Sequence, residues 1–113
     1  MEYKRATRVS NVIKEEISEI LSKRVKDPRI KLITITDVAM TSDLRLARVY
    51  FSFMGEVGDE KDKVLKGLRS ASGFIRRELG KRLGLRHTPD IVFEYDSSLE
   101  YASRIDRILR EIT

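Results

Sequence analysis

Apolar residues at the start of the chain recur at helical spacing. From about Thr7 to Lys26 they return every three or four positions, which predicts an amphipathic helix. The apolar positions are Val9, Val12, Ile13, Ile17, Ile20 and Leu21. Because the residue before a proline avoids helical backbone, Asp27-Pro28 is expected to end this helix.

The pattern then changes to alternation in a segment rich in β-branched residues. Leu32 to Met40 therefore predicts a strand, with Ile33 and Ile35 on one face. The apolar set continues at Val38, which has the opposite parity. A bulge or bend near Asp37 would reconcile the two halves of the strand.

A second alternating segment runs from Arg45 to Phe53 and predicts a second strand. The side chains expected to face inward are Ala47, Val49, Phe51 and Phe53. Thr41-Ser42-Asp43 has the composition of a turn. Because the connection is short, the two strands are expected to form an antiparallel hairpin.

Helical periodicity returns after a predicted loop from Gly55 to Glu60, in which Asp59 is a suitable N-cap. The segment from Lys61 to His87 carries an apolar stripe. The stripe consists of Val64, Leu68, Ala71, Ile75 and Leu79. Gly84 is a stop signal for this helix, and Pro89 prevents its continuation.

The opposite face of this segment combines cations with small side chains. At about 100° per residue, one face collects Lys66, Ser70, Gly73, Arg77 and Lys81. Small residues between cations would let a sugar–phosphate backbone approach closely. Gly73 costs ~1 kcal/mol relative to alanine in a helix, and Ser70 and Ser72 compete for backbone hydrogen bonds. A kink or short break is therefore expected within residues 70–73.

The remaining residues predict one more strand and one more helix. Ile91, Phe93 and Tyr95 alternate with polar neighbours, which indicates a third strand. Ser97 and Glu100 form a capping box before a last helix. That helix carries Leu99, Ala102, Ile105, Leu109 and Ile112. The order α-β-β-α-α-β-α predicts an α+β domain with one three-stranded sheet covered by helices.

Positive charge is concentrated in the segment from Lys61 to His87. It carries nine Lys or Arg and two acids, a net charge of +7 in a chain whose total is +5. A polyanion is the natural partner of such a segment. The alternative is a solvated charged face, or a charge-rich surface of the kind found in heat-tolerant proteins.

The 113 residues fit one domain, residues 1–113. The absence of cysteine excludes disulfides and thiolate metal sites, and favours a reduced, cytoplasmic protein. No apolar run approaches the ~18 residues of a membrane span, so no membrane partner is expected. Basic Arg5 and Arg8, with Lys4, could add phosphate contacts or form a solvated tail.

Catalytic and cofactor motifs are missing from the sequence. His87 is the one histidine, and the sequence contains no nucleophile elbow, phosphate-binding loop or dinucleotide fingerprint. We therefore expect His87 to be a loop residue near a basic surface, and the protein to act without catalysis, cofactor or metal. The predicted strands expose one outward aromatic residue, Tyr50, so an RRM-like stacking surface is not expected.

These observations favour RNA binding through phosphate and shape, on the basic helical segment. The expected RNA-binding residues are Lys66, Arg69, Ser70, Ala71, Ser72, Gly73, Arg76, Arg77, Lys81, Arg82, Arg86, Arg5 and Arg8.

Several blocks together resemble the bacterial ribosome-binding factor A family. They are Lys26-Asp27-Pro28-Arg29, the hairpin ITITDVAMTSDLRLARVYFSF, the segment SASGFIRRELGKRLGLRHTPDIVFEYDSS and the opening helix with Val9, Ile13 and Ile17. The resemblance covers nearly the whole chain. It implies a single KH-like domain of type II topology, α-β-β-α-kink-α-β-α, with helices on one face of the sheet. The family's Ala-x-Gly element would be Ala71-Ser72-Gly73, with Ala71 where ordinary KH domains have glycine.

The resemblance implies a role in assembling the small ribosomal subunit. The expected partners are the free 30S subunit and 16S rRNA, and could include other small-subunit assembly factors. The expected activity is late maturation and processing of 16S rRNA, with a role in cold adaptation, by a cytoplasmic monomer. Three alternatives stay open: a general basic RNA-binding module, a protein-interaction module that meets an acidic protein, and an enzyme that uses scattered acids.

Overall fold

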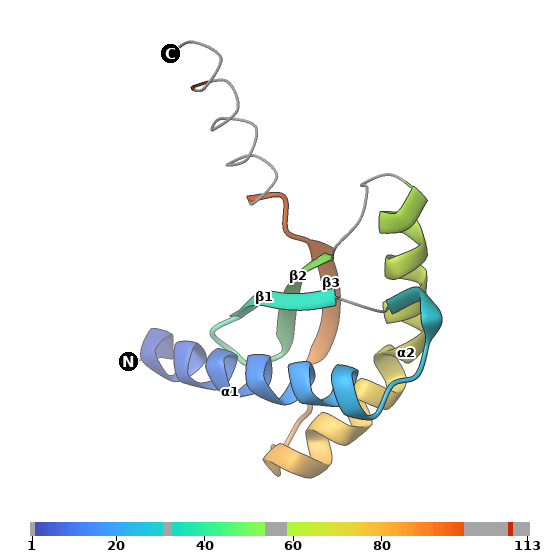
Figure 1. Ribbon diagram of the computed structural model, residues 1–113. Helices are drawn as coiled ribbons and strands as arrows, with labels where there is room; N and C mark the ends of the chain where they lie inside the picture. The colour runs from blue at the N-terminus through green and yellow to red at the C-terminus, as the bar shows by residue number, and fades with distance from the viewer. Residues whose placement is uncertain (1, 31–32, 54–58, 99–108, 110–113) are drawn as a thin grey trace.

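The computed structural model describes residues 2–30, 33–53, 59–98 and 109, without the side chains of residues 2–4. Its elements follow the order α1 (Glu2–Lys23), η1 (Pro28–Ile30), β1 (Ile33–Met40), β2 (Leu46–Phe53), α2 (Asp59–Leu83) and β3 (Asp90–Tyr95), as Figure 1 shows. The predicted last helix, from Ser97 onward, lies almost entirely outside the described residues, and so does the loop at 54–58.

The first helix has the predicted apolar face, but its ends differ from the prediction. Ile13, Ile17 and Ile20 are fully buried. The helix begins at Glu2 rather than near Thr7, and its first turns still contact the core because Ala6 is buried.

The helix also ends before Asp27-Pro28, at Lys23. Instead of extending the helix, Asp27 starts a turn: its Oδ1 accepts a hydrogen bond from the backbone N–H of Arg29 at 2.9 Å. This turn leads into η1, which buries Ile30. The helix was therefore expected to run too far, and the turn at Asp27 follows the end of α1 rather than setting it.

The predicted strand irregularity is confirmed. β1 pairs antiparallel with β2, and the register shifts between Ile35 and Asp37. Because of this shift, Ile35 and Val38 are both buried although they have opposite parity. The predicted hairpin is therefore confirmed, and its turn holds Leu44 in left-handed backbone at φ 61°.

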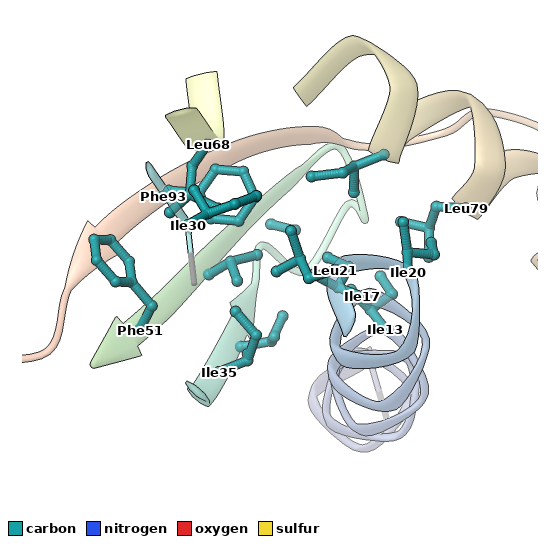
Figure 2. Close-up of a cluster of buried hydrophobic side chains, with 14 of the residues drawn as sticks. Ile13, Ile17, Ile20, Leu21, Ile30, Ile35, Phe51, Leu68, Leu79 and Phe93 are labelled. Carbon is teal, nitrogen blue, oxygen red and sulfur yellow. The ribbon is translucent and has the colours of Figure 1, made fainter. Parts of the chain in front are cut away.

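The strand β3 joins the other side of β2 in parallel, which gives the order β1-β2-β3. Apolar side chains from all three strands, α1, η1 and α2 form one buried cluster (Figure 2). The other face of the sheet exposes Thr34, Arg48 and Val92. The α+β fold with helices on one face of a three-stranded sheet is therefore confirmed.

The long helix α2 is continuous through residues 70–73, so the short break considered from the sequence does not occur. Figure 1 shows instead that α2 changes direction along its length. The hydroxyl of Ser72 donates to the carbonyl oxygen of Arg69 at 2.8 Å. This hydrogen bond stays within the helix, so the serine does not interrupt it.

Candidate nucleic-acid interface

The outer face of α2 is arranged as the spacing predicted. The buried positions of the helix include Val64, Leu68, Ile75 and Leu79. The opposite positions Lys66, Ser70, Gly73, Arg77 and Lys81 are all exposed. We call these five residues the open face of α2. Within the described part of the chain, its three cations have no acidic partner within 4 Å, and Arg69 beside them has none either.

The glycine at the centre of the open face leaves this part of the surface without a side chain. A Cβ built on Gly73 would meet one atom within 4 Å, Nη1 of Arg77 at 3.6 Å. Its backbone is not left-handed, because the one glycine with positive φ in the described residues is Gly84. Gly73 therefore leaves space rather than supplying an unusual backbone conformation.

The other two members of the Ala-x-Gly element lie toward the side of the helix. Ala71 is half-buried and packs against the core. Ser72 is also half-buried, and its hydroxyl is used within the helix. Of this element, only Gly73 is exposed on the open face.

Arg76 holds the loop at residues 84–89 against α2. Its Nε donates to the carbonyl oxygen of Pro89 at 3.3 Å, and its Nη2 donates to that of Thr88 at 3.0 Å. Nη2 also lies 3.6 Å from a carboxylate oxygen of Asp90. Arg76 is thus exposed to solvent, although its guanidinium already donates hydrogen bonds to the loop.

Arg82 has a different environment from the rest of the predicted set. Its Nη1 lies 3.0 Å from Glu16 and 3.2 Å from Glu19, both on α1, and its side chain is 24% exposed. The hydrogen bond to Glu16 raises the pKa of the Arg82 guanidinium above its ordinary value. Arg82 ties α1 to α2, and its guanidinium is less available to a ligand than the exposed cations of the open face.

A hollow of about 350 Å³ lies where α2 meets the loop at 84–89. Its walls are Gly73, Arg76, Arg77, Arg86, His87 and Thr88. We call it the Gly73 hollow. The structure therefore brings together Gly73, Arg76, Arg77 and Arg86 from the predicted set, whereas Lys66 and Arg69 lie nearer the start of α2.

A second hollow of about 450 Å³ adjoins the first and shares Arg76, Arg86, His87 and Thr88 with it. It brings the predicted residue Arg5, from α1, to Arg76 and Arg86. Arg45 also lines it, together with Asp43 and Asp90. Arg8 lies elsewhere, beside a small apolar hollow with Val9, Val12, Leu83 and Leu85.

His87 lies in the loop beside Arg76 and Arg86, as expected of a loop residue near a basic surface. Arg45 and Thr88, which also line this basic region, were not predicted from the sequence. Parallel pairing sets Leu46 opposite Asp90, which brings Arg45 beside the loop before β3. The direction of β3 was the missing information, because the strand pattern alone is the same for parallel and antiparallel pairing.

The described residues contain neither a group of three or more side chains suited to a metal ion nor a helix long and apolar enough to cross a membrane. The three-stranded sheet, its helices and the open face of α2 define a KH-like α+β domain with a basic surface.

The chain matches the family model of ribosome-binding factor A over residues 5–109. It is 50% identical over 111 residues to ribosome-binding factor A of Syntrophus aciditrophicus (strain SB), covering 98% of this chain and 89% of the relative. The chain belongs to the ribosome-binding factor A family.

Solved structures agree with this fold. The crystal structure of ribosome-binding factor A from Thermus thermophilus superposes with a TM-score of 0.71, at 22% identity, over 80% of this chain and 93% of that one. A homology model of the Thermus thermophilus protein, fitted into a cryo-EM map of a 30S–RbfA complex, superposes with a TM-score of 0.66, at 22% identity, over 81% of this chain and 96% of that one.

Proposed function

We propose that this protein is an assembly factor that binds the free 30S ribosomal subunit through the open face of α2. The single observation that carries the proposal is this face, on which Lys66, Arg77 and Lys81 surround Gly73 without acidic partners in the described residues. Family membership and the 30S complex of the Thermus thermophilus relative support the same partner.

On this proposal the ligand is 16S rRNA, and the protein assists its late maturation and processing, including during growth in the cold. It acts as a monomeric single domain in the cytoplasm, with or without other small-subunit assembly factors. Phosphate contacts would supply most of the affinity. The surface at Gly73, which has no side chain, would favour RNA whose backbone shape lets it approach closely.

The decisive experiment is co-sedimentation of the purified protein with free 30S subunits. Wild-type protein should co-sediment, and Arg77→Glu with Lys81→Glu should not. Both positions are exposed, so the thermal midpoint should change little, within ~0.5 kcal/mol in free energy of unfolding. If about six phosphates are neutralised, log affinity should fall with log salt concentration at a slope of about −4 to −5.

A matched control is Lys23→Glu with Lys26→Glu, which changes the net charge equally. Both lysines are exposed, and neither lines the hollows beside α2. This control should retain most of the binding. Equal loss in both double variants would show that only net charge matters, which would favour a general basic module over a specific subunit-binding face.

We also propose that the protein acts without catalysis. The test is incubation with precursor 16S rRNA and with nucleotides, with and without a divalent metal ion. Turnover that follows the protein through purification would contradict this part of the proposal. Binding to an acidic protein as strong as binding to 30S subunits would favour the protein-interaction alternative.

A further inference from the structure

The loop at residues 84–89 is fixed in shape by α2. The N–H of Gly84 donates to the carbonyl oxygen of Gly80 at 3.1 Å, and Gly84 has left-handed backbone at φ 59°. Thr88 lies so close to the helix that a Cβ on Gly80 would come within 2.6 Å of its Oγ1. Pro89 is fully buried. With the two hydrogen bonds from Arg76, these contacts hold the loop before any ligand binds.

The Gly73 hollow lies between this loop and the open face, and its lining favours an anion. Three arginines line it, Arg76, Arg77 and Arg86, and no acidic residue of the described chain does. Guanidinium groups form paired, charge-assisted hydrogen bonds with phosphate oxygens. Because Arg76 is occupied by the loop, Arg77 and Arg86 are the groups available to a phosphate.

The size of the hollow is that of a small-molecule site. Its volume is about 350 Å³. It lies at the small end of the ~300–1,000 Å³ range of small-molecule sites. His87 is one of the lining residues, and its imidazole is an aromatic ring of the kind on which unpaired bases stack.

We propose that the Gly73 hollow receives one unpaired nucleotide of the bound RNA. Its phosphate lies between Arg77 and Arg86, and its base stacks on His87. Gly73 admits the nucleotide because a side chain there would extend toward Arg77 and into the hollow. This inference rests on the proposed function and adds to it: beside the phosphate contacts of the open face, the protein prefers RNA with an unpaired nucleotide.

The experiment compares two short RNA hairpins that differ by one unpaired nucleotide in an otherwise fully paired stem. Fluorescence anisotropy gives the Kd of each for wild-type protein, His87→Ala and His87→Phe. Wild-type protein should bind the bulged hairpin at least about fivefold more tightly, the lower end of what one base–aromatic stack contributes. His87→Ala should lose this preference, and His87→Phe should keep it because phenylalanine also stacks.

Arg69→Ala is the matched control on the same helix. Arg69 is exposed and does not line the hollow, so this variant should weaken both hairpins equally and keep the preference. Arg86→Ala should weaken the bulged hairpin more than the paired one. His87 is exposed, so unchanged thermal midpoints are expected to accompany these results.

Three outcomes would overturn the inference: no preference in the wild-type protein, full preference in His87→Ala, or loss of preference in His87→Phe. Co-sedimentation with 30S subunits is measured on the same samples. Subunit binding without a preference for the bulge would reject the nucleotide site alone. A bulge preference without subunit binding would keep the site and reject the ribosomal proposal.

Discussion

Two glycines on α2 have opposite surroundings. A Cβ on Gly67 would lie 2.7 Å from Cγ2 of Ile30 and 3.1 Å from Cβ of Arg29. A Cβ on Gly73 would meet only a guanidinium nitrogen, at 3.6 Å. Gly67 thus allows η1 to pack on the helix, whereas Gly73 leaves a surface clear. The same residue type serves protein packing in one place and access from outside in the other.

The cations of α1 and α2 divide in the same way. Arg24, just after α1, lies 3.2 Å from Glu78 and places its guanidinium 5.8 Å from the centre of the Phe74 ring. Arg82 pairs with two acids of α1. Arg77 and Lys81, on the open face, have no such partners in the described residues. Charge alone therefore does not identify the candidate interface; the absence of internal partners does.

The largest expected effect comes from filling the space at Gly67. Gly67→Val should destabilise the protein by about 1–3 kcal/mol, because Ile30 and Arg29 must move to admit the side chain. A thermal melt should show a midpoint lower by several degrees. Gly67→Ala should show a smaller loss. An unchanged midpoint for the valine variant would mean that η1 shifts freely and does not hold α2.

Charge reversal should separate the two groups of cations. Arg82→Glu places a third carboxylate beside Glu16 and Glu19, so its thermal midpoint should fall by several degrees. Arg77→Glu should leave the midpoint nearly unchanged and weaken binding to 30S subunits. Equal midpoints for the two variants would contradict the division between packed and open cations.

A smaller effect, of opposite sign, is expected at the centre of the open face. Gly73→Ala should raise the free energy of unfolding by up to ~1 kcal/mol, since alanine is the better helix former and the new Cβ has room. Circular dichroism melts of Gly73→Ala and Gly67→Ala provide the direct contrast. A stability loss in both would show that Gly73 is packed rather than open.

The smallest effect concerns the turn that positions η1. Hydrogen bonds from Arg29 hold the pKa of Asp27 below its ordinary value. The contribution of Asp27 to stability is therefore present above its ordinary pKa of ~3.9 and is lost as the pH falls through the lowered value. Asp27→Asn should lower the thermal midpoint slightly at pH 7. The difference in thermal midpoint between Asp27→Asn and wild type should narrow below about pH 4. A difference that stays constant with pH would show that the Asp27–Arg29 pair is not its source.

The sequence predicted the features that depend on neighbouring residues. The parity change between Ile35 and Val38 located the bulge, and the spacing from Lys66 to Lys81 located the open face. Gly84 was expected to end the helix, and its left-handed backbone agrees with that role.

Features that depend on distant residues were not predicted. Nothing near Arg82 in the sequence reveals that Glu16 and Glu19 lie beside it. The close approach of Thr88 to Gly80 depends on how the loop folds back. In each case the deciding contact is set by the folded surroundings rather than by helix or strand propensity.

The position of β2 has a consequence for how the chain folds during synthesis. β2 is the central strand, but its partner β3 follows only after the whole of α2. The ribosome adds ~5–20 residues per second, so the hairpin emerges while one edge of β2 still lacks its neighbour. That edge belongs to the strand that carries Val49 and Phe51, and an unpaired edge of this kind invites association with other chains. Folding of the sheet is thus completed only when the chain beyond Pro89 has emerged.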